Sequence, residues 1–106
     1  MIHADLIIIG AGPGGYETAI SAAKKGLQVI LIEAQKTGGT CLNEGCIPTK
    51  CLHKNAEFLL ELGYADKLGV TVSASHPDIH QVMNRKNEIV STLSQGVKTL
   101  INIPGG

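Results

Sequence analysis

LIIIGAGPGG, residues 6–15, is the stretch that decides the fold of this chain. Asp5–Ile9 contains a short apolar run that stops at a glycine, which is typical of a buried parallel strand. A glycine-rich turn follows, and the next residues predict a helix that runs to about Lys25 and ends at Gly26. Leu27–Ile32 predicts a second strand. The first third of the chain therefore indicates a β-α-β unit.

The turn carries the spacing G-x-G-x-x-G between a strand and a helix, the context in which this motif binds a dinucleotide. Gly10 permits the tight turn, Gly12 lets a pyrophosphate approach, and Gly15 allows close packing of helix on strand. Gly14 belongs to the same turn, where the helix N–H groups would hold phosphates. Glu33 ends the second strand, and a carboxylate there fits the ribose of FAD or NAD rather than NADP. The alternative is a purely structural turn with Glu33 on the surface.

A second informative stretch is GGTCLNEGCIPTK, residues 38–50. Its cysteines, Cys41 and Cys46, are five positions apart, which in a regular α-helix exceeds the roughly 7 Å limit on the Cα separation of a disulfide. A disulfide here needs a local break, which Gly45 and Pro48 are suited to provide. Zinc binding is the competing use, but this spacing is poor for zinc and no second Cys/His pair is near.

Cys51 follows Cys46 by another five positions, so spacing alone admits either Cys41–Cys46 or Cys46–Cys51. The glycines favour the first pair, because the second would lie in a helix already under way, and Cys51 is then a small buried residue. Three cysteines are an odd number, which argues against a secreted disulfide scaffold. A reducing compartment is expected: the cytoplasm, or the mitochondrial matrix in a eukaryote.

The second half of the chain is predicted to be mainly helical. Thr49–Leu62 predicts a helix, Leu68–Val72 a short strand, and Asp78 the cap of a long amphipathic helix that Pro104–Gly106 ends. Two or three strands with three helices do not complete a parallel sheet, which needs helices on both faces and neighbours on both sides. The pattern is that of the front end of a larger α/β domain.

Charge and composition exclude some partners. Nine basic and nine acidic residues balance, and the only aromatic residues are Tyr16, Phe58 and Tyr64. With no basic run, the chain is not expected to bind nucleic acid or an anionic membrane, and no apolar stretch approaches the roughly 18 residues of a membrane span. A metal pair of His76 and His80 is conceivable, but two exposed histidines are the commoner reading, so no metal site is expected.

Residues 38–50 resemble the redox-active segment of the FAD-dependent pyridine nucleotide-disulfide oxidoreductases, and the resemblance extends over essentially the whole chain. It implies that residues 1–106 are the N-terminal part of an FAD-binding, Rossmann-type domain, with the NAD-binding and dimerisation domains absent from them. Leu42, Ile47 and Thr49 favour the branch of the family that oxidises dihydrolipoamide over the glutathione and thioredoxin reductases.

The resemblance also implies a role for each site residue. Cys46 would be the thiol nearest the flavin and Cys41 the interchange thiol that meets the substrate. Lys50 would lie near the reactive edge of the flavin, although it can also be an ordinary solvated lysine. The other expected contacts are to FAD: Gly39 and Thr40 on the flavin side, and Gly10, Gly12, Gly14, Gly15 and Glu33 on the ADP half.

The implied reaction passes electrons from dihydrolipoamide through the cysteine pair and FAD to NAD⁺. The substrate would be carried on lipoyl domains of 2-oxoacid dehydrogenase or glycine cleavage complexes, and the family's full-length members are homodimers. Their catalytic His-Glu pair has no counterpart among the four histidines here, so these 106 residues alone are expected to be inactive. The alternatives are a mercuric or glutathione reductase-type enzyme, or a stand-alone FAD- or ADP-binding dithiol module without catalytic activity.

Overall fold

The structure, a computed structural model, describes residues 1–102. Strands β1 (Leu6–Ile9) and β2 (Val29–Ile32) pair in parallel, with Leu6 opposite Val29 and Ile9 opposite Ile32, and helix α1 (Pro13–Lys24) connects them. This confirms the predicted β-α-β unit. In chain order the elements are β1 (Leu6–Ile9), α1 (Pro13–Lys24), β2 (Val29–Ile32), α2 (Gly39–Asn43), α3 (Cys46–Leu62), the 3₁₀ turn η1 (Ala65–Leu68) and α4 (Ile79–Ile101).

Helix α1 ends as its sequence predicts. Gly26 has a φ of +91°, a left-handed conformation that glycine adopts without steric cost. Its N–H donates to the carbonyl of Ala23, and the N–H of Leu27 donates to that of Ala22. These two bonds form a Schellman motif, which satisfies carbonyls that the helix end would leave open. The chain is thereby turned back into β2.

Helix α3 begins at Cys46, three residues earlier than predicted. Pro48 is the third residue of this helix, inside the first turn, where a backbone N–H has no helical acceptor. Its missing N–H therefore costs no hydrogen bond. The proline lies within the helix instead of preceding it.

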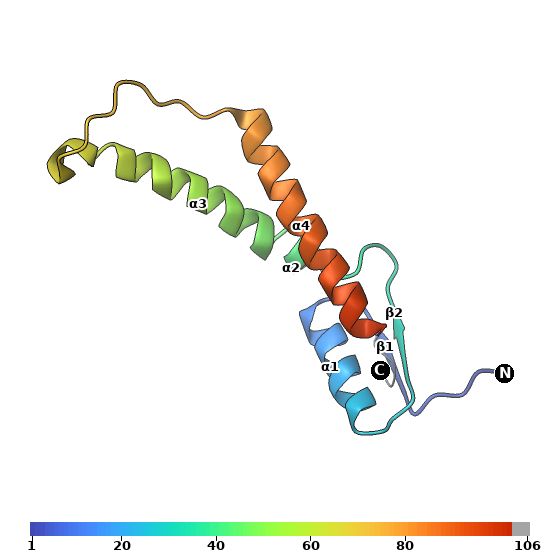
Figure 1. Cartoon of the computed structure of the whole chain (residues 1–106). Coiled ribbons are helices and arrows are strands. Elements are labelled where there is room, and N and C mark those ends of the chain that lie inside the picture. Colours follow the sequence, from blue (N-terminus) through green and yellow to red (C-terminus); the bar gives the residue numbers. More distant parts are fainter. Residues whose placement is uncertain (103–106) are drawn as a thin grey trace.

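The predicted strand Leu68–Val72 is wrong. Ala65–Leu68 forms a 3₁₀ turn that ends at Gly69 with a φ of +78°, and residues 70–72 have no regular structure. The N–H of Val70 donates to the carbonyl of Ala65 within the turn. Strand pairing needs a neighbouring strand, and this segment lies at the far tip of the molecule from the sheet (Figure 1). The apolar pattern that predicted a strand is on an exposed loop.

Helix α4 begins where its capping residue predicts. The Asp78 carboxylate accepts hydrogen bonds from the N–H groups of His80 and Gln81, at 3.0 and 3.3 Å, which satisfies donors at the helix start. The helix extends to Ile101. The ending assigned to Pro104–Gly106 lies outside the described residues.

The molecule is elongated because α3 and α4 form an arm that leads away from the sheet (Figure 1). Its radius of gyration is 19.8 Å, whereas a compact domain of about 100 residues has roughly 13 Å.

Apolar side chains on β1 are exposed to solvent, with Ile9 85% exposed. In the part of the chain that the structure describes, few apolar residues are buried: Ala11, Ala19, Leu42, Cys51 and Val97. This is the β-α-β start of a Rossmann-like domain with an incomplete sheet, as predicted. Among residues 1–102, no helix combines the length and apolar character needed to cross a membrane.

Candidate functional site

The glycine turn between β1 and α1 is built on two close backbone contacts. Gly10 has a φ of +105° and donates its N–H to the carbonyl of Ile32 at 2.7 Å. A Cβ on Gly15 would collide with the carbonyl oxygen of Gly10. Only glycine at residue 15 lets α1 lie this close to the end of β1.

A second contact joins this turn to the cysteine segment. Gly39, the first residue of α2, has a φ of +68°, and a Cβ on it would lie 2.7 Å from the Cα of Gly12. The two glycine segments, 27 residues apart in the sequence, therefore meet backbone against backbone. The structure thus brings the predicted phosphate-binding turn next to the helix that carries Cys41.

The start of α1 has free hydrogen-bond donors. Gly12 is the N-cap and Pro13, without an N–H, is the first helical residue. The N–H of Tyr16 already donates to the carbonyl of Gly12, so the N–H groups of Gly14 and Gly15 are the first-turn donors without a helical acceptor. Gly14 is exposed. Backbone donors left free at a helix start fit the oxygens of a pyrophosphate.

Glu33 lies beside the turn, just after β2. Its Oε1 accepts from the N–H of Ala11 at 2.9 Å and its Oε2 from the N–H of Gln35 at 3.0 Å. These bonds, that of Ala11 first, lower the pKa of the carboxyl from its ordinary value of 4.5. Each oxygen of an ionised carboxylate can accept a further hydrogen bond. Glu33 therefore ties the turn to β2 and can still accept hydroxyl donors.

A pH-dependent contribution to stability follows from the lowered pKa of Glu33. Because the folded-state pKa is below the ordinary value of 4.5, the contribution is fully present above that value and is lost as the pH falls through the folded pKa. We expect Glu33→Gln to abolish this part of the acid sensitivity. Urea unfolding of both chains from about pH 7 to about pH 3 measures it, and parallel pH profiles for the two chains would contradict it.

The disulfide joins Cys41 and Cys46, as the glycines favoured, with 4.7 Å between the two Cα atoms. Cys41 lies in α2 and Cys46 opens α3, so the bond spans the break between the two helices. At that break, a Cβ on Gly45 would lie 3.2 Å from the carbonyl oxygen of Thr40. Cys46 is exposed and Cys41 half-buried, so thiols can reach the bond. Cys51 is a free, buried thiol, as predicted.

Three predicted residues share one cavity. Glu33, Gly39 and Thr40 line a pocket of about 250 Å³ between β2 and α2. Lys50 lies outside this pocket and is exposed on α3, four residues after Cys46. Residues at this spacing share a helix face. The cofactor roles of these residues stay predictions. Among the described residues, no three histidine, cysteine or carboxylate side chains are close enough to form a metal site.

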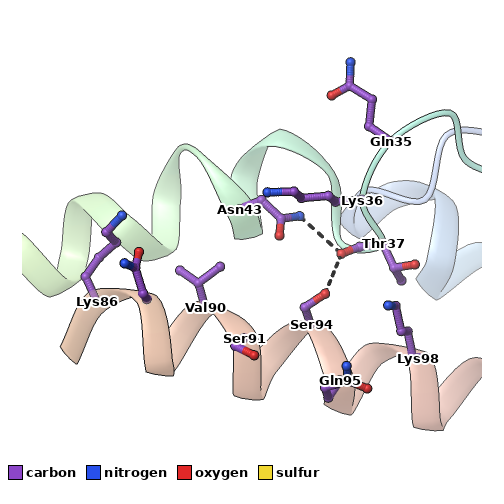
Figure 2. A pocket seen from close by; sticks show the side chains of 11 residues that line it. Gln35, Lys36, Thr37, Asn43, Lys86, Val90, Ser91, Ser94, Gln95 and Lys98 are labelled. Carbon is purple, nitrogen blue, oxygen red and sulfur yellow. Dashed lines mark hydrogen bonds between the residues drawn. The ribbon is translucent and has the colours of Figure 1, made fainter. Parts of the chain in front are cut away.

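The sequence did not predict how the loop before α2 is held. The Thr37 carbonyl accepts two hydrogen bonds, from Asn43 Nδ2 and from Ser94 Oγ, both at 3.2 Å (Figure 2). These residues line a pocket of about 610 Å³ between this loop and α4. Asn43 lies inside the cysteine segment, residues 38–50, and this position is a signal by which the sequence could have identified it. Ser94 carries no local signal, because it is 57 residues from Thr37.

A parallel β-α-β unit whose glycine turn touches a helix with an accessible disulfide defines a class: disulfide oxidoreductases built on a dinucleotide-binding fold. Residues 4–105 match the family described as pyridine nucleotide-disulphide oxidoreductase. The chain belongs to this family.

The relatives it matches are longer enzymes. The chain is 48% identical over 98 residues to a dihydrolipoyl dehydrogenase of Bacillus subtilis, covering 91% of this chain and 21% of the relative. It is 42% identical over 108 residues to that of Pseudomonas aeruginosa, covering 99% and 23%. The chain thus spans about a fifth of the length of these relatives.

Solved structures agree with the fold. A cysteine-to-serine mutant of the HOCl-induced flavoprotein disulfide reductase RclA from Escherichia coli, solved as a Cu(II) complex, superposes with a TM-score of 0.76. It is 33% identical to this chain, and the match covers 99% of this chain and 21% of RclA.

Proposed function

We propose that this chain carries the disulfide and part of the FAD site of a flavoprotein that oxidises dihydrolipoamide, with NAD⁺ as acceptor in the full-length enzyme. The observation that carries the proposal is the contact of Gly39 with Gly12, which places the disulfide-bearing helix against the dinucleotide turn. The names of the two curated relatives described above supply the substrate.

The residues fit the ADP half of FAD. The N–H groups of Gly14 and Gly15 have no helical acceptor at the start of α1, so they can donate to a pyrophosphate, and the turn of Gly10 and Gly12 has no side chain to obstruct it. Glu33 offers its remaining lone pairs to ribose hydroxyls. Gly39 and Thr40 line the cavity that begins at Glu33, in the direction of the cysteines. When bound, FAD supplies a two-electron acceptor beside the dithiol.

The protein's own part of the reaction is thiol–disulfide exchange. One thiolate of dihydrolipoamide attacks the Cys41 sulfur, which breaks the Cys41–Cys46 bond and releases Cys46 as a thiolate. The second substrate thiol, on losing its proton, attacks the substrate sulfur of this mixed disulfide and releases Cys41. Lipoamide leaves as a disulfide, and the two cysteines hold the two electrons that the substrate lost.

The fold favours Cys46 as the leaving thiolate. Cys46 is the first residue of α3, a helix of 17 residues, and the positive end of the helix dipole stabilises an anion there. Lys50, one turn further along on the same helix, adds a positive charge near that face. In this proposal Cys46 and Lys50 face the flavin, while Cys41 meets the substrate.

A second candidate rests on the superposition with RclA, a flavoprotein disulfide reductase. The chain would then serve a reductase with a disulfide substrate other than lipoamide. The identities of 42% and 48% to the dihydrolipoyl dehydrogenases exceed the 33% to RclA, which favours the first candidate. In the first candidate, the partners are lipoyl domains of 2-oxoacid dehydrogenase or glycine cleavage complexes. A second subunit completes a homodimer, and the enzyme acts in the cytoplasm or the mitochondrial matrix.

Nucleotide selectivity tests the role of Glu33. We expect ADP to compete with FAD for the chain at least about tenfold more strongly than adenosine 2′,5′-bisphosphate, because the carboxylate accepts from a free 2′-hydroxyl and repels a 2′-phosphate. Displacement of FAD, followed by flavin fluorescence, measures both ligands. Glu33→Gln is the matched control and should narrow the ratio between the affinities for ADP and for adenosine 2′,5′-bisphosphate. Equal competition by both ligands on the unaltered chain would rule out the proposed ribose contact.

A turnover assay separates the chain from its longer relatives. We expect dihydrolipoamide to reduce the Cys41–Cys46 bond of this chain, while dihydrolipoamide plus NAD⁺ and FAD yields no NADH. The sequence contains one glycine fingerprint, used here for FAD, so these residues hold no second dinucleotide turn for NAD⁺. Thiol counting by mass spectrometry and absorbance at the NADH band measure the two steps. Sustained NADH formation would contradict the expectation that this chain exchanges thiols with dihydrolipoamide but does not reduce NAD⁺.

A further inference from the structure

The loop that enters α2 has an unusual backbone and is held by side chains. Gly38 and Gly39 both have positive φ, +102° and +68°, far from the φ of a regular strand or a right-handed helix. Asn43 Nδ2 donates to the carbonyls of both Thr37 and Gly39, at 3.2 and 2.9 Å. Ser94, which lies on α4, donates through its Oγ to the carbonyl of Thr37.

The carbonyl of Thr37 is therefore a junction of three segments. A carbonyl oxygen has two lone pairs, and here α2 and α4 each use one (Figure 2). The N–H of Gly38 in addition donates to the carbonyl of Ala11 at 2.8 Å, which ties the same loop to the glycine turn. Gly38 is buried and Leu42 packs beneath it. The loop is fixed on each of these sides.

We propose that Ser94, together with Asn43, is a positioning residue for the redox disulfide: by holding the Thr37 carbonyl it keeps α2, and with it Cys41, in register with Cys46. Neither residue touches the sulfur atoms in this role. The inference rests on the proposed function, because it assumes that the cysteine pair cycles between disulfide and dithiol.

The two redox states depend on this anchor unequally. In the oxidised chain the disulfide itself joins α2 to α3, across a Cα separation of 4.7 Å. In the dithiol chain only non-covalent contacts keep Cys41 near Cys46. Loss of the Ser94 hydroxyl therefore increases the freedom of the dithiol state more than that of the disulfide, which lowers the effective concentration of one thiol at the other.

The experiment is a redox titration of the full chain in glutathione buffers, without flavin. Samples are quenched with acid, alkylated and counted by mass spectrometry, which distinguishes one free thiol from three. We expect Ser94→Ala to lower the equilibrium constant for disulfide formation about threefold, the scale of one hydrogen bond. Ser94→Thr, which keeps a hydroxyl, should restore it, and Asn43→Ala should exceed Ser94→Ala because two carbonyls lose a donor.

Ser91→Ala is the matched control. Ser91 lines the same pocket from the same helix, and Figure 2 draws no bond from it to Thr37. A merely structural role of Ser94 would lower the stability of oxidised and reduced chains alike and leave the equilibrium constant unchanged. An unchanged constant in Ser94→Ala, or an equal change in Ser91→Ala, would overturn the proposal. Because no flavin is present, this outcome is independent of whether the chain binds FAD.

Discussion

Gly15→Ala is expected to unfold the chain, although the substitution adds a single methyl group. That methyl would fall on the carbonyl oxygen of Gly10, a backbone atom that no side-chain rotation can move aside. Overpacking of a well-packed interior already costs about 1–3 kcal/mol, and here α1 must lift off β1 to relieve the clash. We therefore expect the free energy of unfolding to fall by more than about 3 kcal/mol. Circular dichroism and urea unfolding measure it.

The neighbouring glycine is the matched control for this prediction. A Cβ on Gly14 would meet nothing within 4 Å, and alanine is a better helix residue than glycine by about 0.5–1 kcal/mol. Gly14→Ala should therefore be as stable as the unaltered chain or slightly more so. Similar effects of the two substitutions would mean that the close approach of α1 to β1 does not hold the fold together.

Cys46→Ser is expected to abolish thiol–disulfide exchange altogether. Without the Cys46 sulfur, Cys41 cannot form an intramolecular bond across the break between α2 and α3, and Cys51 is buried further along α3. Dihydrolipoamide should then leave the variant unchanged, whereas it should convert the unaltered chain from one free thiol to three. Mass spectrometry after alkylation counts the thiols.

Cys51→Ser separates the two cysteine pairs that the spacing admits. Because Cys51 lies outside the disulfide, this variant should keep full exchange with dihydrolipoamide. A loss of exchange in Cys51→Ser, or exchange that survives in Cys46→Ser, would mean that Cys51 is part of the redox pair and that the assigned roles are wrong.

The sequence predicted well what short-range chemistry determines. The strand before Gly10, the helix end at Gly26 and the cap at Asp78 each depend on residues within one turn of the feature. The break at Gly45 is likewise local, so the sequence could favour Cys41–Cys46 over the alternative pair.

Features that depend on distant residues were missed or misassigned. Leu68–Val72 has the composition of a strand, but within residues 1–102 no strand lies beside it at the tip of the arm, and the left-handed Gly69 ends a turn there instead. The contact of Gly39 with Gly12 and the bond from Ser94 to Thr37 join segments far apart in the sequence. No local pattern encodes such contacts, since they arise only once the helices pack.

The measurement that tests the central claim most directly is a visible absorption spectrum of the chain equilibrated with FAD and freed of unbound flavin. Spectra are recorded before and after mild reduction by a dithiol, with Cys46→Ser as the control. The account predicts a flavin band that stays with the protein. On reduction, a long-wavelength shoulder should appear in the unaltered chain but not in Cys46→Ser, because the Cys46 thiolate then lies beside the flavin. A colourless protein would contradict the proposed FAD site, and a flavin band without the shoulder would contradict the place assigned to Cys46.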